Sequence, residues 1–412
     1  MFVKTKNLRG PTVIAVMALL VGLLSPVAAA QDHGGDLDAP GLRVTLERQL
    51  GQHVVLATEA MRAGVTGSED FDAAAAALDR NTQELTGSIE AVYGADGAEA
   101  FEGMWSDHID FFVQYTVGVA EDDTDAQDEA LERLDAYRED FGAFLEEATE
   151  GQVSAGEIAE GLQVHVDQLV TQIDAFAEED YDTAFTVSRE AFGHMFMTAQ
   201  ALAGAITGQF PDEFDGDLEG HGIDLQSDLG LLLSEHAALA IQAMRAGVDG
   251  DPQFEAADAA LMANTQDLTA AIEGIYGADA AEAFMQMWQD HIDFFVQYTV
   301  GLAEDDQQAQ DAALERLDAY RQDFSAFLEE ATDGNVPADG AAEGLQVHVD
   351  DLVDQIDLYH AGDFEGAYDS AYSGYTHMYD VAQILADGIA AQMMDDMPEG
   401  GVATGGGGTA TN

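Results

Sequence analysis

Hydrophobic positions along most of the chain recur every three to four residues, which is the spacing of one face of an α-helix. Alanine, leucine, glutamate and glutamine dominate between the breaks and favour helix, and glycines such as Gly94 and Gly151 mark the breaks. In the first half, the pattern predicts six helices at residues 41–63, 69–92, 95–120, 124–149, 154–178 and 181–208.

The same pattern occurs twice. "WSDHIDFFVQYTVG" begins at Trp105, and "WQDHIDFFVQYTVG" begins at Trp288, 183 positions later. The offset is constant along both halves, so we predict two repeats, 40–213 and 224–397, joined by a linker at 214–223 and followed by a flexible Gly/Thr-rich tail at 398–412. Short connections favour antiparallel neighbours. The predicted fold class is therefore all-α, with two tandem antiparallel helical-bundle repeats of about six helices each.

The first thirty residues read as a signal peptide. Lys4, Lys6 and Arg9 precede an apolar stretch at 12–24, and "VAAA" ends at Ala30. No later apolar run is long enough to span a membrane. We therefore expect a protein without a membrane span that is secreted to the extracellular space or the cell envelope.

The charge is extreme. The chain carries 80 acidic and 13 basic residues, a net charge of −67. Because the predicted signal peptide holds three basic residues and no acidic ones, the mature chain would carry 10 − 80 = −70. Such a surface repels itself at low ionic strength, which favours adaptation to high salt over the alternative of a low-affinity cation sponge. It also makes nucleic acid an unsuitable partner.

Histidines occupy predicted core faces near the middle of their helices. If the helices pack side by side with their ends roughly level, their midpoints lie at one height whether a helix runs up or down. The histidines of one repeat are therefore expected to form one layer. The predicted set is His53, His108, His165 and His194 in the first repeat and His236, His291, His348 and His377 in the second.

Such a layer favours a metal site, because imidazole is the commonest metal-binding side chain and bundle cores commonly hold metal sites. Four neutral imidazoles, or three with a water, suit copper, zinc or iron. Met61 and Met104 lie near the histidines in sequence, and thioether sulfur favours copper slightly. Haem remains a less favoured alternative. The competing interpretation is that each histidine is a packed polar residue, with Asn81, Tyr137 and Arg138 as its hydrogen-bond partners.

Enzymatic chemistry has little support. The chain has no cysteine, and no H-E-x-x-H or E-x-x-H motif accompanies the histidines. Arg62, Arg133 and Arg138 recur in the second repeat and are interpreted as structural ion pairs. An enzyme ranks third, after a metal-binding protein and a structural or interaction module of the cell envelope.

The order of these signals resembles an uncharacterised family of secreted bacterial all-helical proteins, some of them labelled copper amine oxidase-like. The matching features are His53 with Arg62, "YGADGAEAFEGMWSDHI", "VHVDQL" and a last helix that ends in "GQFP". The resemblance implies a secreted helical module and no established reaction. The topaquinone-forming N-Y-[DE]-Y motif is absent, so amine oxidase activity is not expected.

Overall fold

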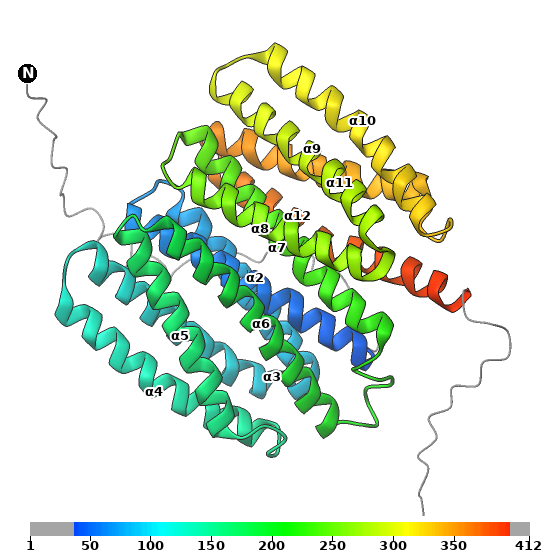
Figure 1. The fold of residues 1–412 in the computed structure, drawn as a ribbon. Helices are drawn as coiled ribbons and strands as arrows, with labels where there is room; N and C mark the ends of the chain where they lie inside the picture. The colour runs from blue at the N-terminus through cyan, green and yellow to red at the C-terminus, as the bar shows by residue number, and fades with distance from the viewer. Residues whose placement is uncertain (1–36, 396–412) are drawn as a thin grey trace, which may run out of the picture. The chain divides into compact units, whose positions relative to one another are not determined.

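The computed structural model describes residues 37–395, and the chain from Asp38 onward forms one compact unit. The described residues contain eleven α-helices and no strand (Figure 1), which confirms the all-α prediction. None of these helices combines the length and the apolar character needed to span a membrane. The predicted signal peptide (1–30) and the predicted tail (398–412) lie outside the described residues.

Residues 39–209 form the first bundle. Its helices are α2 (Ala39–Thr66), α3 (Phe71–Ala120), α4 (Thr124–Ala148), α5 (Ala155–Ala177) and α6 (Tyr181–Gln209). Helix α3 covers two of the six predicted helices and changes direction at Gly94, whose φ of 74° is in the left-handed region that glycine tolerates. Each helix packs against the next, and α6 packs against α2, so the bundle closes around its core.

Residues 221–395 form the second bundle. Its helices are α7 (His221–Asp249), α8 (Phe254–Tyr276), α9 (Ala278–Ala303), α10 (Gln307–Ala331), α11 (Ala338–His360) and α12 (Phe364–Asp395). Gly277, 183 positions after Gly94, has a φ of 83° and separates α8 from α9. Helix α12 packs against α7 and closes this bundle in the same way.

Several helices begin with a side-chain cap. Ser154 accepts a hydrogen bond from the backbone N–H of Glu157, whose carboxylate bonds back to Ser154 in a capping box at the start of α5. Asp123 and Asp180 cap α4 and α6 in a similar way. The connections between consecutive helices are short, and short connections make sequential helices antiparallel neighbours.

The two bundles contact each other through α2 with α7, α3 with α12, and α6 with α8. Aromatic residues 183 positions apart meet there: Phe192 lies 6.3 Å from Tyr375, and Phe196 stacks on Tyr379, also at 6.3 Å between ring centroids. A Cβ on Gly51 would lie 2.6 Å from the Tyr375 hydroxyl oxygen, so this close approach requires glycine. The contact resembles the self-complementary interface of a two-fold dimer.

A buried polar cluster lies in the same interface. We call it the interface cluster, and it consists of Glu59, Arg62, Asp70, Gln242, Arg245 and Tyr368. Glu59 contacts both arginines at 3.4 Å and accepts a 2.9 Å hydrogen bond from the Gln242 amide. Asp70 pairs with Arg62 at 2.7 Å. One carboxylate, Glu59, therefore joins the two bundles through charges that are removed from water.

Candidate metal centre

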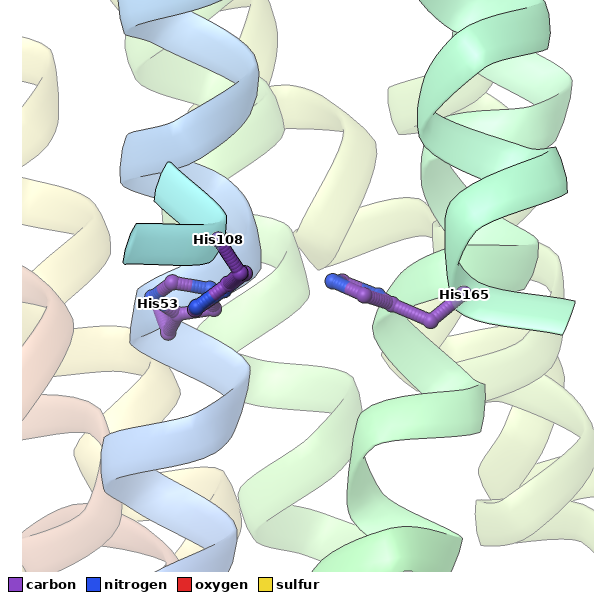
Figure 2. Close-up of side chains that lie close together, drawn as sticks. All are labelled: His53, His108 and His165. Atoms are coloured by element: carbon purple, nitrogen blue, oxygen red, sulfur yellow. The ribbon is translucent and has the colours of Figure 1, made fainter. Parts of the chain in front are cut away.

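Three histidines meet in the core of the first bundle. His53 comes from α2, His108 from the second half of α3, and His165 from α5. Their ligand nitrogen atoms all lie within 4.8 Å of one another. Figure 2 shows His53 and His108 close together, with the ring of His165 reaching toward them from the opposite side. We call this group the first triad.

A second triad has the same composition. His236 of α7, His291 of α9 and His348 of α11 also have ligand nitrogen atoms within 4.8 Å of one another. The Nε2 atoms of His236 and His291 are 3.4 Å apart. The ring centroids of His236 and His291 lie 5.4 Å apart, against 5.5 Å for His53 and His108, so the two triads have nearly the same geometry.

The fourth predicted histidine of each repeat does not join its triad. The Nε2 atom of His194 lies 3.0 Å from the carbonyl oxygen of Gly161, and that of His377 lies 2.9 Å from the carbonyl oxygen of Gly344. Both side chains are half-buried. The buried face of α6 is formed by Phe192, Met195, Phe196 and Ala199, one position away from the face the sequence pattern predicted. His194 therefore points toward α5 rather than into the centre.

Aromatic side chains surround each triad. The indole of Trp105 lies 4.7 Å from the His53 ring and 4.6 Å from the His108 ring, and Tyr137 stacks on His108 at 5.1 Å. Trp288 and Tyr320 repeat these contacts at the second triad. The sequence pattern alone did not assign Trp105 to the site. Its position three residues before His108, on the same helical face, is the signal that could have placed it there.

The Nδ1 atom of every triad histidine lacks a hydrogen-bond partner at normal distance. Among the described residues, none bonds to the Nδ1 atoms of the six histidines, to the indole N–H of Trp105 and Trp288, or to the hydroxyls of Tyr137 and Tyr320. Two of the three partners predicted for the histidines are engaged elsewhere: Asn81 donates to the Gln49 carbonyl, and Arg138 pairs with Asp135. Buried polar groups are normally satisfied, so this concentration of unpaired groups marks the triads as unusual.

Burial keeps the triads uncharged. Desolvation, reinforced by His165, lowers the pKa of His108 to about 3, and desolvation with His194 nearby lowers the pKa of His165 to about 4. Desolvation and the two neighbouring imidazoles hold the pKa of His53 well below its usual value. The second triad shows the same directions. Neutral imidazoles offer lone pairs to a cation at neutral pH.

Two cavities reach the second triad. The larger, about 510 Å³, is lined by His236 and His291 at one end and by Asp251, Glu255 and Asp258 at the other. The smaller, about 110 Å³, is almost entirely apolar and touches His348, Trp288 and Tyr320. The second triad therefore borders both cavities and is not completely enclosed by packed side chains.

Comparison with protein-family models, with curated proteins and with solved structures finds no match to this chain.

Proposed function

We propose that this protein binds metal, with one ion held by the histidine triad of each bundle. The observation that carries the proposal is the convergence, in the core of each bundle, of three buried, neutral imidazoles whose ligand nitrogen atoms all lie within 4.8 Å of one another. Neutral imidazoles packed this closely can bind one cation together.

The spacing within the second triad supports this proposal. Two nitrogen ligands at about 2.0–2.1 Å from a tetrahedral zinc ion are separated by about 3.3 Å. The Nε2 atoms of His236 and His291, at 3.4 Å, already have that separation. A small movement of the third imidazole would complete a site with three protein ligands and an open position, which is the arrangement of catalytic rather than structural zinc sites.

The donor set narrows the choice among copper, zinc and iron. Three neutral nitrogens without a carboxylate suit zinc and copper, whereas the common non-haem iron site uses two histidines and a carboxylate. Haem fits less well. A haem iron has only two axial positions, so three converging imidazoles exceed the number of protein ligands that it can bind.

The alternative is a structural or interaction module whose histidines only pack. One observation favours it: histidines that bind metals nearly always donate their second N–H to an acceptor, and the described structure provides none for the six Nδ1 atoms. The parallel stacking of Tyr137 on His108 also accounts for part of the ring's position without a metal.

Metal analysis of the full-length protein, purified without an affinity tag, separates the two functions. We expect two metal ions per chain and a melting temperature that falls when a strong chelator is added. A protein that binds no added zinc or copper at either triad, and whose melting temperature ignores chelator, would show that the histidines only pack.

We further propose that the protein is secreted and adapted to high salt. The basic and apolar pattern of residues 1–30 and the excess of 80 acidic over 13 basic residues support this setting. The resemblance to a family of secreted helical proteins is consistent with it and adds no reaction.

A further inference from the structure

We infer that the large cavity beside the second triad is an entry and exit route for cations, which makes the second metal site exchangeable with solvent. This inference rests on the proposed metal binding. It adds the route by which a cation reaches the second triad and the residues that line that route. Its starting point is that one continuous cavity of about 510 Å³ is lined both by the buried ligands His236 and His291 and by exposed residues.

Small side chains on α7 create the path. Ala240, Ala243 and Gly247 line the cavity at three- and four-residue spacing, between His236 and the helix end at Gly250. That segment of helix is about 20 Å long at 1.5 Å per residue. A Cβ on Gly247 would lie 3.3 Å from side-chain atoms of both Phe254 and Thr299. The opposite wall of the cavity is therefore close to α7 at this point, and a larger side chain on α7 would narrow the path.

Acidic side chains surround the outer end. Asp251, Glu255 and Asp258 line the cavity near the turn between α7 and α8. Burial, reinforced by the negative charge of Asp293, raises the pKa of Asp258. Carboxylates that repel one another at the mouth of a low-dielectric cavity raise the local concentration of cations.

The inner end of the cavity reaches two of the proposed metal ligands. His236 and His291 are almost completely buried, their Nδ1 atoms have no partner among the described residues, and both line this same cavity. Met244 lies on the wall between the two ends and offers a thioether that is a soft ligand for copper. A cation can therefore pass from carboxylate oxygens to imidazole nitrogens without crossing packed apolar core.

The two repeats differ at two of the three acidic positions of the mouth. Asp258 corresponds to Ala75 and Asp251 to Ser68, 183 positions earlier, whereas Glu255 corresponds to the acidic Asp72. The triad histidines and the small residues of the path are shared, since Ala57, Ala60 and Gly64 precede their counterparts by the same offset.

Stopped-flow uptake of Co²⁺ by the full-length apoprotein tests the route. The background variant His108→Ala removes a ligand from the first triad, so the signal comes from the second. In this background, Asp258→Asn and Glu255→Gln should each slow uptake roughly twofold to threefold at the lowest salt that preserves the fold, and high salt should abolish the difference. Ala243→Leu should slow uptake more than tenfold. Final occupancy should stay unchanged in all three.

The matched control is Glu315→Gln, which removes an exposed carboxylate of α10 outside the cavity wall and should leave the uptake rate unchanged. Equal uptake rates in all variants, with normal final occupancy, would overturn the route while leaving the metal site in place. A His108→Ala protein that never binds Co²⁺, although its helical spectrum is intact, would overturn the metal proposal and the route together. If Ala243→Leu fails to fold, the two charge variants and their salt dependence still decide the question.

Discussion

His236 and His291 lie on different helices, yet their Nε2 atoms face each other at 3.4 Å in the core of the second bundle. Desolvation and the charges of neighbouring imidazolium forms lower the pKa of both rings and keep them neutral. One neutral ring can donate its Nε2–H to the Nε2 atom of the other. A cation between the rings would replace that hydrogen bond with coordination.

Replacing His291 with alanine should empty the second metal site and leave the first loaded, so that metal content falls from two ions per chain to one. The loss of stability should grow with free metal, following RT ln(1 + [L]/Kd). His377→Ala is the matched control, since His377 lies outside the triad and bonds to the Gly344 carbonyl. If His291→Ala costs only about 1–3 kcal/mol at every metal concentration, the histidine belongs to the packing alone.

The stability of the apoprotein should fall as the pH decreases below about 6.5, the ordinary pKa of histidine. The unfolded chain binds protons in this range, whereas His165 and His108 stay neutral in the folded state until the pH approaches their pKa values of about 4 and about 3. Because the unfolded state binds more protons, each buried histidine should contribute a slope of about 1.4 kcal/mol per pH unit. Urea unfolding between pH 7 and pH 5 measures it.

The double variant His108→Phe with His291→Phe provides the comparison for that slope. It removes two of the six titrating groups, so its stability should depend less steeply on pH than that of the wild-type apoprotein. Identical slopes would show that other groups, such as the partly buried carboxylates, control acid unfolding.

Low ionic strength should destabilise the protein. At about 3 M salt the Debye length is roughly 2 Å, and at 0.01 M it is about 30 Å, so repulsion among the 80 acidic residues acts over most of the surface. The melting temperature should decrease steadily between these limits. A constant melting temperature over the whole range would contradict salt adaptation.

Replacing Glu59 with glutamine should cost about 3 kcal/mol in urea unfolding, because Arg245 would then lose its carboxylate partner in a buried environment. Glutamine preserves the shape and can still accept from Gln242, so the change isolates the charge. Glu315→Gln, on the exposed face of α10, is the neutral comparison. A loss below about 0.5 kcal/mol would mean that water reaches the interface cluster and satisfies the arginine.

The fragment 40–213 should be helical and should unfold cooperatively, because it contains five helices that close around their own core. It should be less stable than the full chain, since Tyr368, Tyr372, Tyr375 and Tyr379 of α12 pack into that core from the other bundle. Circular dichroism with urea titration tests both points. A fragment without a cooperative transition would place the domain boundary elsewhere.

The sequence predicted the helices well because each has a hydrophobic stripe at helical spacing and glycines mark several of the breaks. Even the break at Gly94 was expected, although α3 continues through it as one element. The predicted ion pairs of Arg62 and Arg138 are also present. Local spacing determines such features, so a single sequence can reveal them.

The site was predicted less completely because convergence depends on the rotation of each helix. His53, His108 and His165 were placed correctly in one layer. His194 lies on α6, but that helix turns Phe192 and Met195 inward, which leaves the histidine half-buried beside α5. Phe192 contacts Tyr375 of α12, 183 positions away, and no local pattern contains that information.

The interface cluster also bears on which halves can pair. Within it, the first bundle contributes the acids Glu59 and Asp70 with one arginine, while the second contributes Arg245, with Gln242 and Gln253 at the positions of the two acids. Two first bundles from separate molecules would bury an excess of carboxylates, and two second bundles would bury unmatched guanidinium groups. The halves of one chain therefore complement each other better than either complements itself, which disfavours the pairing of like halves from separate molecules at high concentration.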